Sequence, residues 1–136
     1  MVREIVRGEK IFSAPARKAG IADISILDDL MDTLRANAER CVGMAANMIG
    51  ENVRIIVFAD GDGYGEMLNP AILSKKDPYE AEEGCLSLDG SRRVKRFRTI
   101  KVRWQNRKME TRIKNFTGWT AQIIQHEIDH CDGKII

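Results

Sequence analysis

The stretch Ile124-Gln125-His126-Glu127-Ile128-Asp129-His130 contains the pattern His-Glu-x-x-His and holds the only two histidines of the chain. On a helix, side chains four positions apart lie on one face, so both imidazoles can point at a single metal ion. Glu127 follows the first histidine and can reach a water on that ion without binding the ion. This layout is typical of metal-dependent hydrolases in which the carboxylate acts as general base and then as general acid. The alternative is a surface helix that carries these residues by chance.

The composition predicts one globular domain over residues 1–136, with 43% hydrophobic and 31% charged residues. A net charge of +2 gives no reason to expect a specific nucleic-acid partner. Three cysteines, an odd number, argue against a disulfide scaffold and for a reducing compartment. Charged residues interrupt the first 25 positions, so no signal peptide is expected, and no apolar run is long enough to span a bilayer. We therefore expect a cytoplasmic protein without a membrane partner.

Two helices are predicted, one near each end of the chain. Ser25 to Glu39 forms an amphipathic helix near the N-terminus, because its apolar residues follow helical spacing and Ser25 can cap it. The helix that carries the histidines runs from about Thr117 to Gly133, and Gly133 is suited to end it.

The strands are predicted in pairs. Asn52 to Ala59 is rich in Val and Ile, and the turn Asp60–Gly65 joins it to Glu66–Leu73, which Pro70 interrupts. Asp60 and Asp62 resemble part of a calcium loop, but the closing Glu is absent, so a hairpin turn is favoured. Thr99–Trp104 and Met109–Ile113 alternate apolar and polar residues and form a second hairpin.

Five of the seven residues from Arg92 to Arg98 are basic. On an edge strand, basic side chains discourage pairing with another sheet, and this interpretation is favoured. Contact with phosphate or with another acidic partner is the alternative.

A catalytic zinc-type site takes three protein ligands and leaves one position for water. Both histidines are used, so the third ligand is a cysteine or a carboxylate. Cys131 adjoins His130 on the same helix, and adjacent helical residues do not face the same way. The residues alone leave Cys41 and Cys85 open.

The chain resembles the peptide deformylases over nearly its whole length. That family carries three motifs in order, written G-x-G-x-A-A-x-Q, E-G-C-L-S and Q-H-E-x-D-H. The corresponding stretches here are Cys41–Met48, Glu83-Gly84-Cys85-Leu86-Ser87 and Gln125–His130, and the second and third match at every fixed position.

The resemblance implies an α+β fold in which antiparallel β-strands pack around a central metal-binding α-helix. It also implies one divalent metal ion held by Cys85, His126 and His130, with Fe²⁺ the usual ion and Zn²⁺ or Ni²⁺ possible. The implied reaction removes the N-formyl group from the initiator methionine of new peptides during protein biosynthesis. Glu127 would move the proton, and the backbone N–H of Leu86 would stabilise the oxyanion.

The substrate pocket implied by the resemblance departs from the family pattern. Val42, Gly43 and Met48 of the first motif face the substrate, but Met48 stands where the family has a Gln that donates an N–H to the formyl oxygen. A thioether cannot donate, and losing one such donor typically slows a reaction about 10²–10³-fold. Asn47 would replace that donor only if the loop shifted by one residue.

Further pocket residues are expected on the helix and after Cys85. Trp119, Gln122 and Ile123 precede His126 on its face of the helix, and a Trp and a Gln indicate an altered methionine pocket. Arg92 occupies a place where some members contact the peptide backbone. Six residues follow His130, whereas many bacterial members continue further, so ribosome association stays open.

Two alternatives to deformylation therefore remain, and both arise from Met48. The chain could hydrolyse a different small N-acyl or amide substrate, or it could be a catalytically impaired metal-binding homologue.

Overall fold

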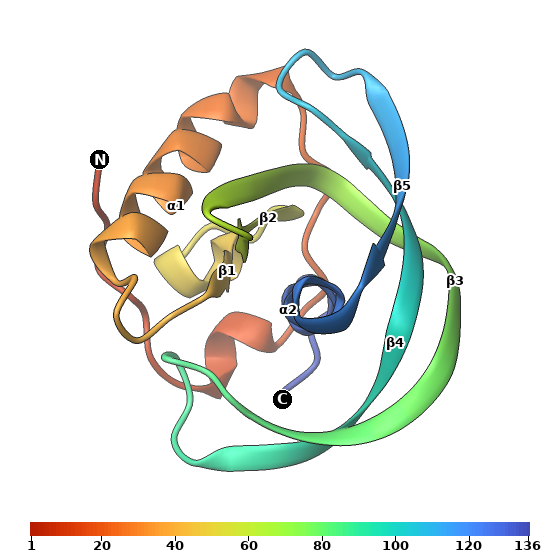
Figure 1. Cartoon of the computed structure of the whole chain (residues 1–136). Coiled ribbons are helices and arrows are strands. Elements are labelled where there is room, and N and C mark those ends of the chain that lie inside the picture. Colours follow the sequence, from red (N-terminus) through yellow and green to blue (C-terminus); the bar gives the residue numbers. More distant parts are fainter.

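The computed structural model describes residues 1–136 as a five-stranded sheet with two α-helices and three short 3₁₀ helices. Figure 1 shows the arrangement, with β3 and β4 curving around α2. The elements in chain order are η1 (Glu9–Phe12), η2 (Ile21–Asp23), α1 (Ile24–Ala36), β1 (Gly43–Ala45), η3 (Ala46–Ile49), β2 (Ile55–Asp60), β3 (Gly63–Gly84), β4 (Ser91–Gln105), β5 (Thr111–Thr117) and α2 (Gly118–Cys131).

The strands pair in sequence order, β1-β2-β3-β4-β5, and every pair is antiparallel. A mixed fold of an antiparallel sheet and helices is thus the architecture that the sequence predicts. The two longest strands, β3 and β4, pair from Leu68 opposite Gln105 to Gly84 opposite Ser91. Register shifts interrupt their pairing, and such bulges bend a strand and increase its twist. The bent pair reaches from the sheet centre to the loop that holds Cys85.

The two helices pack on opposite faces of the sheet. Strand β2 lies between two apolar cores, and its residues alternate between them. Ile55 and Val57 belong to the core that contains α1, whereas Ile56 and Phe58 belong to the core that contains α2. Successive strand residues point to opposite faces, so a continuous apolar run is the pattern of a strand buried on both sides.

Helix α2 lies at the centre of the molecule and is seen nearly end-on in Figure 1. It packs against β1, β2, β4 and β5. Nine of its fourteen residues are buried, among them His126, Glu127 and His130. A helix buried on most sides needs partners for its polar residues, and those partners define the site described below.

Several predicted boundaries were wrong. Strand β3 runs through Pro70 without ending, because Pro70 lies at the register shift between Leu68 and Ala71, where its missing N–H costs no ladder bond. Helix α1 ends at Ala36 rather than Glu39, and its N-cap residue is Asp23 rather than Ser25.

No helix combines the length and apolar character that crossing a bilayer requires.

Gly65 is required by close packing across the β2–β3 pair. It lies opposite Phe58, and a Cβ at this position would be 2.4 Å from two atoms of the phenylalanine ring. Phe58 is 2% exposed and makes an edge contact with Phe116, so the ring has little room to move.

We therefore expect Gly65→Ala to lower the free energy of unfolding by about 1–3 kcal/mol, the usual cost of overpacking a core. Urea denaturation measures this change. Gly63→Ala is the matched control, because a Cβ there meets nothing closer than the Asp60 carbonyl at 3.9 Å. Equal midpoints for the two variants would show that Phe58 moves aside freely.

Candidate metal centre and pocket

Helix α2 and the loop after β3 bring one cysteine and two histidines together. One potential ligand atom from each of Cys85, His126 and His130 lies within 4.8 Å of the other two. The Nε2 atoms of the two histidines are 3.0 Å apart. His130 is fully buried and its ring stacks on Phe12, with centroids 4.3 Å apart.

The histidine side chains fit a metal ion. His126 Nδ1 is 2.7 Å from Glu83 Oε1, which leaves Nε2 free to face the other two groups. Two imidazole nitrogens at 3.0 Å can share a hydrogen bond or bind one metal ion together. Burial lowers the pKa of His126, but hydrogen bonds with Cys85 and Glu83 outweigh it and raise the pKa to about 10. Burial and the neighbouring His126 lower the pKa of His130 to about 3. A carboxylate behind a ligating histidine is the usual arrangement at protein metal sites.

The Glu83 carboxylate is held by donors from three sides. Arg96 donates to both of its oxygens, with the shortest distance 2.7 Å, and Gln122 donates from 2.9 Å. Arg96 also contacts Asp129 of α2 at 2.6 Å, and its side chain is only 4% exposed. Burial raises the pKa of Glu83, but the hydrogen bonds from His126 and Arg96 outweigh it and lower the pKa to about 2. Glu83 is thus a permanent anion next to His126.

Glu127 is buried, and its Oε1 has no hydrogen-bond partner in the protein. Burial raises its pKa to about 7, where a carboxyl group can both accept and return a proton. Gly43 makes room for it, because a Cβ at Gly43 would lie 3.0 Å from Glu127 Oε2 and 2.6 Å from Ile123.

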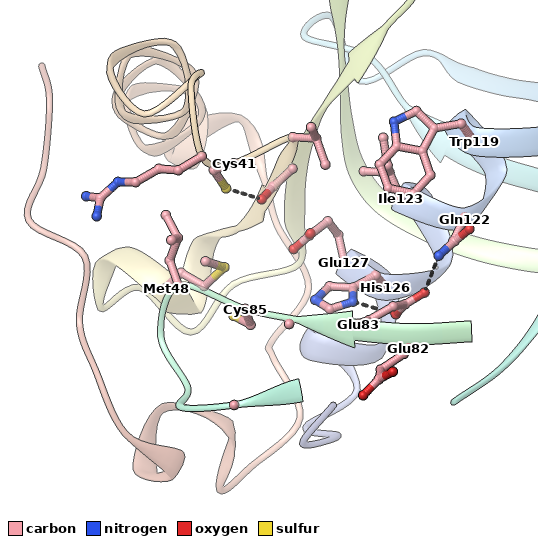
Figure 2. Close-up of a pocket in the computed structure, with 16 residues that line it drawn as sticks. Cys41, Met48, Glu82, Glu83, Cys85, Trp119, Gln122, Ile123, His126 and Glu127 are labelled. Atoms are coloured by element: carbon pink, nitrogen blue, oxygen red, sulfur yellow. Dashed lines mark hydrogen bonds and ion pairs between the residues drawn. The ribbon is translucent and has the colours of Figure 1, made fainter. Parts of the chain in front are cut away.

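These residues open onto a pocket of about 490 Å³ (Figure 2). Figure 2 shows Met48, Cys85, His126 and Glu127 around it, with Cys85 close to His126. Of the site residues predicted from the sequence, those that line the pocket are Val42, Gly43, Met48, Cys85, Leu86, Trp119, Gln122, Ile123, His126 and Glu127. His130 lies behind His126 and belongs to the ligand cluster. Arg92 is not a lining residue, and its guanidinium is 3.9 Å from Glu9.

Met48 and Asn47 take different positions. Met48 is 1% exposed and lines the pocket. Asn47 does not line it, because its amide nitrogen donates to the carbonyl oxygen of His130 at 2.8 Å. The one-residue shift that would make Asn47 a donor to substrate would break this bond at the end of α2. The Leu86 N–H, by contrast, makes no hydrogen bond to another backbone group.

The cysteines left open by the sequence are separated by the geometry. Cys41 lines the pocket, but its thiol contacts the Gly43 carbonyl at 3.0 Å, and burial raises its pKa to about 12. Cys131 is buried in the apolar core, and burial raises its pKa to about 12 as well. Neither joins the histidine cluster, which favours Cys85 as the third ligand.

An N-terminal arm, Val6-Arg7-Gly8, contacts two segments near the pocket, η3 and the loop after β3. The N–H of Val6 donates to the Met48 carbonyl at 2.8 Å, and Arg7 donates to the Leu86 carbonyl at 2.5 Å. The N–H of Gly8 donates to the Ser87 carbonyl at 2.7 Å.

Glu83 and Arg96 were not predicted from the sequence. Glu83 begins the Glu-Gly-Cys-Leu-Ser motif, two residues before the candidate ligand Cys85, and this position was the available signal. The sequence predicts Arg96 as one of several basic residues on an edge strand. Within Arg92–Arg98, however, Arg96 is only 3% exposed and faces α2. Without the strand's pairing, the sequence does not tell which basic residue points inward.

An antiparallel sheet bent around a helix with a His-Glu-x-x-His pattern is typical of metal-dependent hydrolases. Comparison with known proteins is more specific. A family model described as polypeptide deformylase matches residues 3–136. The peptide deformylase of Clostridium beijerinckii is 49% identical over 136 residues, which is the full length of both chains. That of Heliobacterium modesticaldum is 43% identical over 109 residues, covering 79% of this chain and 71% of the relative. The chain belongs to the peptide deformylase family.

Solved structures agree with this assignment. The peptide deformylase of Thermotoga maritima has a TM-score of 0.88 and 28% identity, and the match covers 99% of this chain and 95% of that one. A class I type b peptide deformylase of Acinetobacter baumannii bound to Met-Ala-Ser has a TM-score of 0.87 and 27% identity, with 99% and 96% covered.

The buried ion pairs of Arg96 predict that replacing it costs far more unfolding free energy than replacing Arg93, another arginine of β4. Arg96→Met leaves the Glu83 and Asp129 carboxylates without their buried cation, and we expect it to cost about 3–5 kcal/mol of unfolding free energy. Chemical denaturation of the metal-free protein checks this value.

Arg93→Met is the matched control, because Arg93 pairs with Glu80 at the surface, where the two side chains are 77% and 71% exposed. We expect it to cost less than about 1 kcal/mol. If both variants lost the same stability, the ion pairs of Arg96 would be no stronger than a surface pair.

Proposed function

We propose that this chain is a metal-dependent peptide deformylase, which removes the N-formyl group from the N-terminal methionine of peptides. The observation that carries the proposal is the grouping of Cys85, His126 and His130 next to Glu127 at the wall of one pocket. The family membership and the 49% identity over the full chain support the same activity. Residues 1–136 would form a single catalytic domain, with α2 as its central metal-binding helix and α1 as its N-terminal amphipathic helix.

Cys85, His126 and His130 would hold one divalent ion, with Fe²⁺ the proposed ion and Zn²⁺ or Ni²⁺ as alternatives. One thiolate and two neutral imidazoles offset only part of a divalent charge, so the bound ion would supply the Lewis acidity that activates water and polarises a carbonyl. The hydrogen bond between His126 and Glu83 supports this ligand set, because it fixes which ring nitrogen faces the cluster.

The protein's own residues would move the proton and stabilise charge. Glu127 takes the proton from the attacking water as the oxygen–carbon bond forms at the formyl carbon. It then gives that proton to the departing amine as the carbon–nitrogen bond breaks, which releases formate and a free N-terminus. The Leu86 N–H, free of backbone partners, donates to the developing oxyanion. Because Oε1 of Glu127 is buried and has no partner in the protein, it is available to accept and return this proton.

The substrate would be an N-formylated peptide or another small N-acyl compound, with its methionine side chain against Val42, Gly43, Trp119, Gln122 and Ile123. The Acinetobacter baumannii structure, whose bound Met-Ala-Ser has the sequence of a deformylated product, supports a peptide in this pocket. Three free cysteines support a cytoplasmic location. We include neither a membrane nor a specific nucleic acid among the partners. Arg92 lies outside the pocket lining, so any contact with substrate would require the peptide to extend beyond it.

Glu127→Gln tests the proton-transfer role. The amide has nearly the same size but cannot accept the proton, so we expect kcat on formyl-Met-Ala-Ser to fall about 10²–10⁴-fold. Metal content, measured on the same anaerobic preparation, stays at one ion per chain. Glu80→Gln, on the exposed part of β3, is the control and keeps its activity. A metal-loaded native protein without turnover would contradict the proposed reaction.

A second candidate function is hydrolysis of a different N-acyl or amide substrate. Met48 favours it, because this buried lining residue offers no hydrogen bond where family members place a Gln. Asn47 is held by the His130 carbonyl and supplies no replacement.

We expect Met48→Gln to raise kcat/KM on formyl-Met-Ala-Ser by about 10²–10³-fold, because it adds one donor to the developing oxyanion. Met48→Leu fills similar space without a donor and should give no gain. Assays of both variants, with acetyl and other N-acyl peptides alongside, separate the candidates. Full activity in the native protein and no gain from Met48→Gln would show that this site needs no side-chain donor.

A further inference from the structure

We propose that Gln122 is a positioning residue for the metal centre, which acts with Tyr79 to hold Glu83 against His126. The family resemblance predicts Gln122 in the substrate pocket, as part of a methionine pocket with altered shape and polarity. The hydrogen bonds of its amide assign it a different role. This inference rests on the proposed function only in taking His126 as a metal ligand.

Gln122 bridges the strand and the ligand network. Its Nε2 donates to Glu83 Oε2 at 2.9 Å, and its Oε1 accepts from the Tyr79 hydroxyl at 3.0 Å. Figure 2 shows Gln122 and His126, both on α2, with a dashed line from each to Glu83. Tyr79 in turn lies beneath Arg98, whose guanidinium is 4.7 Å from the ring centroid.

The orientation of the amide follows from chemistry. Both oxygens of Glu83 accept hydrogen bonds from Arg96, so the group of Gln122 that faces Oε2 is its NH₂ donor. The amide oxygen then faces Tyr79, whose hydroxyl can donate. Both polar groups of the amide therefore have protein partners, and the surface that Gln122 leaves for the pocket is its aliphatic stem.

Glu83 needs this donor because its two oxygens are divided between different partners. Oε1 is shared by His126 and Arg96, whereas Oε2 receives only Gln122 and one longer bond of 3.0 Å from Arg96. The Glu83 side chain is 8% exposed, so water would not easily replace the lost donor. Without Gln122, Arg96 alone holds Oε2, so the carboxylate and the His126 ring that it orients are held less firmly.

The test measures metal affinity, which requires no turnover. Gln122→Met keeps the apolar stem and removes the amide, and Tyr79→Phe removes only the hydroxyl. Competition with a chromophoric chelator, using Zn²⁺ or Co²⁺ as the probe, should show about tenfold weaker binding for Gln122→Met, the lower end of the range for partners of ligating histidines. Tyr79→Phe should also weaken metal binding, but by a smaller factor than Gln122→Met. The ratio of kcat/KM for formyl-Met and formyl-Leu peptides should stay unchanged in Tyr79→Phe, because Tyr79 does not line the pocket.

The double variant provides an internal check. If Tyr79 acts only through Gln122, adding Tyr79→Phe to Gln122→Met causes no further loss of metal affinity. If the two residues act independently, the losses of binding free energy add. Thermal unfolding of the metal-free proteins separates a loss of affinity from a loss of fold. Trp119→Ala is the control, because Trp119 lines the same pocket outside this network and should leave metal affinity unchanged.

Unchanged metal affinity in Gln122→Met, together with an altered formyl-Met to formyl-Leu ratio, would overturn the proposal and return Gln122 to substrate selection. An inactive native protein would count against the proposed deformylation but not against the positioning role, because chelator competition reports on the site directly.

Discussion

Arg96 lies buried between two carboxylates from different elements, Glu83 of β3 and Asp129 of α2. This cation joins both long strands to the central helix, since Arg96 itself belongs to β4. It also contacts the anion that orients His126, so the packing of the long strands on α2 and the candidate ligand set involve the same group. Burying one cation with two anions is favourable only when all their hydrogen bonds are made, and here Gln122 and His126 complete them.

The same logic explains how α2 can be central and polar at once. Strand β5 pairs with β4 only as far as Thr99, so Phe97, which lies opposite Pro78 of β3, has no strand partner on its other side. Gln125 fills that place, because its side-chain amide accepts from the Phe97 N–H and donates to the Phe97 carbonyl, both at 2.9 Å. The motif residues that flank the histidines therefore have structural roles as well: Gln125 replaces a strand and Asp129 binds Arg96. Glu127 is the one whose oxygen is left without a partner.

The parts of the fold that could be predicted are those set by local pattern. The helical spacing of the histidines predicted α2, and the continuous apolar run predicted β2, which is buried by helices on both faces. The length of β3 could not be predicted, because bulges carry it past Pro70. Likewise, Arg96 differs from its basic neighbours only through the strand register and the approach of α2, which are contacts between distant parts of the chain. Arg92 was expected at the substrate, yet its side chain extends toward Glu9. The roles of the ligand residues themselves stay predictions that metal analysis can test.

The arm Val6-Arg7-Gly8 gives the pocket a property that its lining residues do not reveal. Consecutive residues of one short segment bond to Met48 of η3 and to Leu86 and Ser87 of the loop after β3, nearly forty positions further along the chain. The two walls on the oxyanion side therefore share one support and form a single cooperative unit for local opening. A fluctuation that frees the arm would loosen both walls together, so the accuracy of the site depends on a segment that contributes no side chain to its chemistry.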